Sequence, residues 1–396
     1  MKLLEVLIMD NNLSNMKNNL FYWATGELSQ DAFICWLMSY ATKDSKEDAV
    51  IKACAQEFLW MFVKKSSSED KSNIGPSDIV VDKIERQVTV NEEDEEKKQK
   101  KRGAIDVLLT VSTPKDKYKI IIEDKTYTSE HDDQLQFYKK AITDEFQEYT
   151  VLGVYYKTGF QSDYEAVKEA GYCRIGRAEI VECLKKYEDK TINVIFNDYY
   201  EYLKDLHKKA EQFESLPLQE WDWQQILGFF SFVQPQIDQG SLRKYGFKAN
   251  FDYVHNQAGG FYGMWLDNKC NYFYSEGDEQ IKYEIYLMMQ FINQKLEICL
   301  KLGIKEMPEK GKLTPSNIRD RLVYDEKWKY KLDKYSYQKP ARLGYGKNIT
   351  IGIFTSQFTL STESENYKQA MADLEGAMQG FAKMTEAICI GEKCAE

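Results

Sequence analysis

The chain has 396 residues, of which 43% are hydrophobic and 14% aromatic, and its formal net charge is −10. This length suits two or three domains with hydrophobic cores of their own, and the seven prolines, without repeats or long polar tracts, argue against a disordered protein. The negative charge argues against coating nucleic acid by bulk attraction, although it is compatible with a local basic groove.

The sequence also argues against membrane, zinc and serine-hydrolase classes. No apolar run approaches the ~20 residues of a membrane-spanning helix, and the N-terminal segment is a poor secretion signal, so we expect a cytoplasmic protein. The eight cysteines include no pair with CxxC spacing. The three histidines lie far apart, which leaves little material for a histidine-rich zinc site or a Ser-His-Asp hydrolase.

Two helices are predicted at the beginning of the chain, over residues 25–41 and 46–64, because their apolar residues recur with a helical period. A strand is predicted over 78–90. The segment from Glu92 to Arg102 then changes from five acids to five bases. Two interpretations stay open: a solvated loop between two strands, or a basic arm, Lys97 to Arg102, that contacts phosphates.

Two apolar runs follow, Ile105 to Val111 and Tyr118 to Ile122, separated by a turn-like segment. After them the period becomes helical, and Ser129 is the expected N-cap of the next helix. Strands and helices then alternate as far as a long helix over 193–213. This order predicts an α/β domain with a mixed sheet over residues 1–215, followed by a smaller α+β domain over 216–396.

The two apolar runs carry acids where buried strands rarely do. Asp106 lies inside the first run, and the second ends in Glu123-Asp124-Lys125. Burying an ionised carboxylate is costly unless it is paired or binds a metal. If the two strands pair as a hairpin, Asp106 and Glu123 reach the same edge of the sheet, and Glu123 and Lys125 share a face.

Such a group of oxygen ligands suits Mg²⁺ or Mn²⁺. The carboxylates of Asp106 and Glu123 would bind the ion, and Asp124, whose side chain points to the opposite face, would contribute its backbone carbonyl. Lys125 would orient or help to deprotonate the attacking water and offset negative charge. The structural alternatives are a turn acid at Asp106 and an exposed Glu123–Lys125 pair at the end of an edge strand.

This arrangement of Asp106, Glu123 and Lys125 on neighbouring strands after a leading helix resembles the PD-(D/E)xK nuclease superfamily, over roughly residues 20–213. The resemblance implies a restriction-endonuclease-like core, a mixed β-sheet flanked by helices. Gln134 and Tyr138, at i and i+4, resemble the Q-x-x-x-Y pattern of the RecB-like branch. The acid of the family's first helix often adds a metal ligand, and here Glu27 is the first candidate and Asp31 the second.

The resemblance implies a Mg²⁺- or Mn²⁺-dependent nuclease whose substrate is DNA, with a role in bacterial defence or DNA repair. Its catalytic residues would be Asp106, Glu123, Lys125, Gln134 and Tyr138, and its metal ligands Glu27, Asp106, Glu123 and Asp124. The family's proline is replaced by Ile105. The four-cysteine iron–sulfur pattern of some RecB-like members is also missing, as are helicase motifs and a P-loop.

Two other functions remain open. The first is a catalytically inactive nuclease fold that acts as a nucleic-acid or protein binding module. The second is a hydrolase of small molecules or nucleotides, which no glycine-rich phosphate loop supports. The C-terminal domain would select a target or a protein partner, or form a homodimer, and its aromatic residues could stack on bases but more often form a core.

Overall fold

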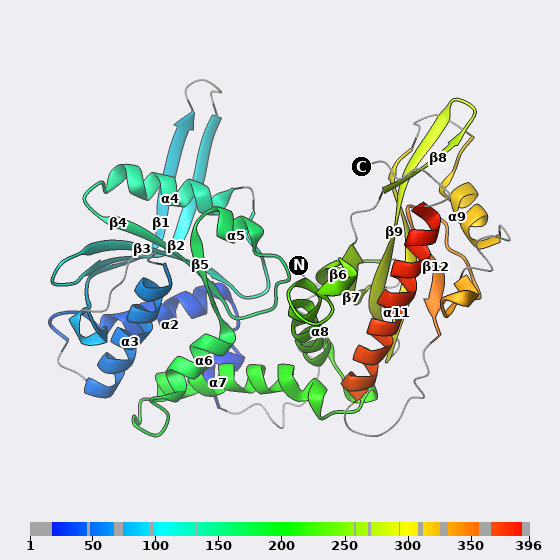
Figure 1. Cartoon of the computed structure of the whole chain (residues 1–396). Helices are drawn as coiled ribbons and strands as arrows, with labels where there is room; N and C mark the ends of the chain where they lie inside the picture. Colours follow the sequence, from blue (N-terminus) through cyan, green and yellow to red (C-terminus); the bar gives the residue numbers. More distant parts are fainter. Residues whose placement is uncertain are drawn as a thin grey trace. The chain divides into compact units, whose positions relative to one another are not determined.

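The computed structural model (Figure 1) describes residues 18–45, 48–66, 74–94, 99–131, 133–256, 259–267, 271–292, 294–307, 312–324, 332–355 and 366–389. The chain forms two compact units, Met1–His207 and Lys208–Glu396. Within the described residues, no helix is both long enough and apolar enough to cross a bilayer.

A five-stranded sheet forms the centre of the first unit, in the order β1-β2-β3-β4-β5. The strands are β1 (Val80–Asp94), β2 (Gln99–Ser112), β3 (Lys117–Lys125), β4 (Thr150–Lys157) and β5 (Tyr172–Gly176). Strands β1, β2 and β3 pair antiparallel, whereas β3, β4 and β5 pair parallel. The mixed sheet and the predicted hairpin of β2 with β3 are therefore confirmed.

Helices cover both faces of this sheet (Figure 1). One face carries α2 (Glu27–Ser39), α3 (Ala49–Ser66), α6 (Arg177–Lys185) and α7 (Val194–Glu211). The other carries α4 (Gln134–Glu145) and the short α5 (Glu165–Glu169). Two hydrophobic clusters result, one on each side of the sheet. Strand β3 contributes Ile120 and Ile122 to the first and Ile121 to the second, so it is apolar on both faces.

Side chains two residues apart on a strand normally point to the same face of the sheet. Along β2 this alternation breaks at Asp106. Ile105 packs with the α4 cluster, whereas Val107, two residues later, packs with the α2–α3 cluster. Opposite this break, Gln87 of β1 has a φ of 53°, which non-glycine residues rarely adopt. The ladder between β2 and β3 starts only at Val107 and Ile122. Asp106 therefore lies where the pairing of β2 with β3 ends, although β2 stays paired with β1 on both sides of it.

Two local predictions were wrong. The charged segment was expected as a loop from Glu92, but β1 continues to Asp94 and pairs there with Gln99. Of the predicted basic arm, 97–102, residues 97–98 lie outside the described residues and 99–102 belong to β2, where only the side chain of Arg102 is described. Helix α4 begins at Gln134 with Asp133, not Ser129, as its N-cap residue.

The second unit contains a seven-stranded sheet in the order β11-β12-β10-β9-β7-β6, with β8 paired to β9. Its strands are β6 (Lys248–Val254), β7 (Phe261–Asp267), β8 (Asn271–Glu276), β9 (Glu279–Ile292), β10 (Lys295–Glu306), β11 (Tyr337–Gln338) and β12 (Asn348–Phe354). Its helices include α8 (Trp223–Asp238), α9 (Pro315–Tyr324) and α11 (Asn366–Cys389). All of these strand pairs are antiparallel, so this is a second sheet domain of different construction.

Candidate active site

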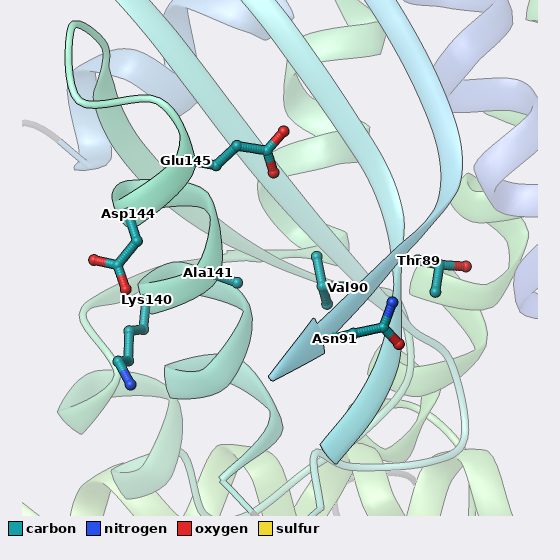
Figure 2. Close-up of a pocket in the computed structure, with 7 residues that line it drawn as sticks. All are labelled: Thr89, Val90, Asn91, Lys140, Ala141, Asp144 and Glu145. Atoms are coloured by element: carbon teal, nitrogen blue, oxygen red, sulfur yellow. The ribbon is translucent and has the colours of Figure 1, made fainter. Parts of the chain in front are cut away.

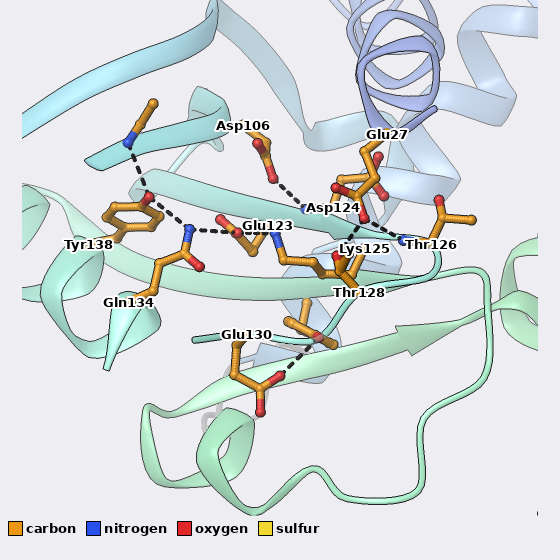
Figure 3. Close-up of polar contacts among 12 residues, drawn as sticks. Glu27, Asp106, Glu123, Asp124, Lys125, Thr126, Thr128, Glu130, Gln134 and Tyr138 are labelled. Atoms are coloured by element: carbon orange, nitrogen blue, oxygen red, sulfur yellow. Dashed lines mark hydrogen bonds and ion pairs between the residues drawn. The ribbon is translucent and has the colours of Figure 1, made fainter. Parts of the chain in front are cut away.

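The middle of β2 and the C-terminal end of β3 bring the acids of the two apolar runs together (Figure 3). The Asp106 carboxylate accepts a hydrogen bond from the backbone N–H of Asp124 at 2.9 Å. Beside it on β3, Glu123 is 0% exposed and Lys125 is 8% exposed. The exposed Glu–Lys pair that the sequence left open as an alternative is therefore wrong, because both charges are buried.

Glu123 uses one of its two oxygens for all of its hydrogen bonds. Its Oε1 accepts from Lys125 Nζ at 2.5 Å and from Gln134 Nε2 at 3.0 Å. Its Oε2 is buried and has no hydrogen-bond partner among the described residues. An unpaired buried carboxylate oxygen is costly, so this atom is available to a ligand that can approach it.

Burial and repulsion by nearby carboxylates raise the pKa values of the two acids. Burial, and then the charge of Asp106, raises the pKa of Glu123 to about 7. Burial also raises the pKa of Asp106, against the hydrogen bond from Asp124 and the charge of Lys125. Burial disfavours the charged form of Lys125, but the Glu123 carboxylate outweighs it, and the pKa of Lys125 is raised. Lys125 is therefore held as an ammonium at neutral pH.

Gln134 and Tyr138 connect helix α4 to this group. Gln134 Nε2 donates to Tyr138 Oη at 2.8 Å as well as to Glu123. Tyr138 Oη also accepts from the backbone N–H of Ala104 at 3.1 Å. Gly103 makes room for the ring, because a Cβ there would lie 2.5 Å from a ring carbon of Tyr138. The helix is thereby tied both to Glu123 and to the strand that carries Asp106.

Glu27, the first residue of α2, lies beside the end of β3. Its Oε1 accepts from the backbone N–H of Thr126 at 3.0 Å and from Thr128 Oγ1 at 2.8 Å. Both hydrogen bonds use the same oxygen, so within the described residues Oε2 is left for another ligand. The structure therefore places Glu27 next to the strand that carries Glu123 and Lys125.

Asp31, the second candidate on α2, is linked to Asp106 through Gln87. Gln87 Nε2 donates to Asp31 Oδ2 and to Asp106 Oδ1, each at 3.2 Å. Asp31 is 1% exposed, and burial followed by the charge of Asp106 raises its pKa to about 7. Sequence reasoning missed Gln87, because a polar residue in an edge strand gives no signal of this contact.

Asp124 points away from Glu123, as predicted from its position on the strand. Its carboxylate, 0% exposed, accepts a hydrogen bond from Gln30 of α2. Burial raises the pKa of Asp124 well above its usual range, and the charge of Asp31 adds to the effect. The side chain therefore lies between the sheet and α2, while its backbone N–H serves Asp106.

A family model decides between the classes that this geometry allows. The model described as the PD-(D/E)XK nuclease superfamily matches residues 18–220. The chain belongs to the PD-(D/E)XK nuclease superfamily. The match covers the whole five-stranded sheet and every residue of the site described in this subsection, so the fold of the first unit is the restriction-endonuclease-like core. Searches of curated proteins and of solved structures found no significant match.

The acidic residues of the candidate site fit a divalent cation that keeps several of its bound waters. Among the described residues, no three Asp, Glu, His or Cys side chains are close enough to form a complete protein site. Mg²⁺, however, usually binds through one or two carboxylates and keeps several waters. Asp106 and the unpartnered Oε2 of Glu123 supply that donor set, so the hard-oxygen chemistry of the site fits the ion.

A cavity of about 530 Å³ lies elsewhere on this nuclease-superfamily core, between β1 and the C-terminal half of α4 (Figure 2). Its lining residues are Thr89, Val90, Asn91, Lys140, Ala141, Asp144 and Glu145. Two acids and one lysine in this lining do not suit a phosphate backbone. The cavity shares no residue with the acidic group around Glu123, so we assign it no part in the chemistry.

Proposed function

We propose that this chain is a metal-dependent nuclease that hydrolyses phosphodiester bonds in DNA. The observation that carries the proposal is the buried, unpartnered Oε2 of Glu123 beside Asp106, with Lys125 bound to the other oxygen of Glu123. A structural role alone gives no reason to bury two acids side by side, since each raises the free energy of the other's charged form. A cation between them relieves both.

The protein would bind the cation through Asp106 and Glu123, with the carbonyl oxygen of Asp124 as a further ligand. Because the three carboxylates are not close enough together in this structure, Glu27 Oε2 would join them only as the ion binds. When bound there, Mg²⁺ or Mn²⁺ supplies a water of lowered pKa and offsets charge on a phosphoryl oxygen. The raised pKa of Lys125 keeps its amine protonated. Lys125 therefore orients the water and stabilises developing negative charge, instead of removing the proton itself.

Gln134 and Tyr138 would act through Glu123. The Gln134 amide holds Glu123 Oε1, and Tyr138 holds Gln134 in place. Both bonds fix the orientation of Oε2, in the way that outer ligands orient the residues of a metal site. The i, i+4 spacing of these two residues supports placing the chain in the RecB-like branch. For the second unit we propose selection of a target or a protein partner.

The experiment is a cleavage assay on linear double-stranded, circular and single-stranded DNA and on RNA, each in Mg²⁺, in Mn²⁺ and in EDTA. The proposal expects cleavage of DNA in either metal and none in EDTA, and the circular substrate tells whether a free end is needed. Binding of DNA without cleavage in any metal would favour an inactive nuclease fold that serves as a binding module. Cleavage of RNA alone would overturn the choice of DNA.

A further inference from the structure

A second buried lysine lies beside the proposed site and has no part in the chemistry described so far. Lys157 is the last residue of β4 and pairs in parallel register with Lys125 on β3. It is 1% exposed, and none of the described carboxylates forms an ion pair with it. Burying an ammonium without a partner charge is costly. The hydrogen bond that Lys157 makes in place of an ion pair therefore needs an explanation.

The contact is with the segment that connects β3 to α4. Lys157 Nζ donates to the backbone carbonyl of Thr128 at 2.5 Å. Two residues earlier on the same face of β4, Tyr155 Oη donates to Glu130 Oε2 at 3.0 Å. Residues 126–131 have no regular secondary structure. Side chains of β4 therefore hold this segment in place.

The same segment holds Glu27. Thr126 N–H and Thr128 Oγ1 both donate to Glu27 Oε1, at 3.0 and 2.8 Å (Figure 3). The chain just after β4 also passes close to Thr126, since a Cβ at Gly159 would lie 1.9 Å from the Thr126 carbonyl oxygen. An unbroken series of contacts thus runs from Lys157 through Thr128 to Glu27.

The charged groups around Lys157 also bear on its role. Glu27 and Glu130 lie close enough to favour its ammonium form, although burial dominates and lowers the pKa of Lys157 to about 8. An apolar side chain of similar length, such as methionine, could fill the space, but it could not donate to the Thr128 carbonyl. The loss of that bond frees the Thr128 backbone, and with it the hydroxyl that holds Glu27.

We propose that Lys157 is a positioning residue for Glu27: it fixes Thr126–Thr128, and that segment turns Oε2 of Glu27 toward the cation. This inference rests on the proposed function, because it requires a cation at Asp106 and Glu123. Residues that orient metal ligands typically contribute about 10- to 100-fold in metal affinity. The effect of Lys157 should therefore appear in cation affinity without any substrate.

The test is calorimetric titration of Mn²⁺ into the full chain without DNA. Lys157→Met should weaken Mn²⁺ binding about 10-fold, and Thr128→Val should weaken it in the same direction. The matched control is Lys119→Met, which removes another buried lysine of the same sheet, one that donates to Thr110 Oγ1 at the opposite end of β3. The control should bind Mn²⁺ as the wild type does.

A double-mutant comparison separates positioning from general loss of structure. Lys157→Met should add little to the loss caused by Glu27→Gln, because both changes remove the same ligand. Fully additive losses, or unchanged affinity in Lys157→Met, would overturn the role of Lys157 while leaving the nuclease proposal intact. If Lys157→Met does not fold, as judged by circular dichroism, Thr128→Val decides the question by the same comparison. A wild type that neither binds Mn²⁺ nor cleaves DNA would overturn both proposals.

Discussion

The carboxylate of Asp106 and the backbone N–H of Asp124 are joined by a hydrogen bond of 2.9 Å at the point where β2 and β3 stop pairing regularly. This contact replaces the missing ladder bond with one to a side chain. It fixes Asp106 next to Glu123, whose own orientation depends on Lys125 and Gln134. The geometry of the two acids is therefore set by the backbone of β3 and by side chains of β3 and α4.

Lys125→Met should abolish most of the cleavage while leaving DNA binding within a few-fold of the wild type. The substitution removes the ammonium that stabilises developing charge, an effect typically worth about 100- to 1,000-fold in rate. Single-turnover cleavage and a separate binding measurement in Ca²⁺ or EDTA distinguish the two steps. Equal losses in binding and cleavage would indicate that Lys125 contributes only to substrate affinity.

Gln134→Ala should raise the Mg²⁺ concentration needed for half-maximal cleavage by about 10-fold. The reason is that Glu123 Oε1 loses one of its two donors and its orientation loosens. Tyr138→Phe should have a smaller effect in the same direction, since it acts through Gln134 and leaves the Ala104 N–H without a partner. A Mg²⁺ requirement unchanged in both variants would contradict this role.

Gln87 combines a strained backbone with a bridge between Asp31 and Asp106. Both Gln87→Ala and Gln87→Gly should lose the bridge and cleave more slowly. The glycine variant should be more stable than the alanine variant by about 1 kcal/mol, because glycine adopts positive φ without strain. Thermal unfolding of the two variants side by side measures this difference. A more stable alanine variant would show that the positive φ at this position carries no strain.

The metal-free protein should lose stability as the pH rises through neutrality. Burial raises the pKa of Glu123 from 4.5 to about 7, so the folded chain binds this proton more tightly than the unfolded chain. The resulting stability is complete below the unfolded value and is lost as the pH rises through the folded value. In EDTA, the free energy of unfolding of the wild type should fall by about 1 to 3 kcal/mol more than that of Glu123→Gln between about pH 5 and about pH 8. Urea denaturation measures it, and parallel pH profiles would contradict it.

The sequence was sufficient to predict the positions of Asp106, Glu123 and Lys125, because acids inside apolar strands stand out against a period of two. It also predicted the mixed sheet, since an antiparallel pair followed by alternating strands and helices has few other solutions. The contact of Gln134 with Tyr138 followed from helical spacing alone. In each case the pattern that mattered was local or joined neighbouring elements.

Other features depend on contacts between distant residues. The helix after β3 begins at Gln134, and the segment where Ser129 was expected to start it is contacted instead by Lys157 and Tyr155 of β4, through Thr128 and Glu130. A lysine at a strand end is typical of solvent exposure, and no pattern in the sequence indicates that Lys157 is buried. The charged residues Glu92–Asp94 favour a loop by composition, whereas they belong to β1 and pair with Gln99–Lys101 of β2.

The central claim is that Asp106 and Glu123 bind a cation that cleavage requires. Its most direct test is single-turnover DNA cleavage in Mg²⁺ by the wild type, by Glu123→Gln and by the control Lys119→Met, with EDTA added to a parallel sample of each. We expect cleavage by the wild type and the control, at least about 100-fold slower cleavage by Glu123→Gln, and none in EDTA. Cleavage by Glu123→Gln at the wild-type rate, or cleavage that persists in EDTA, would contradict the claim.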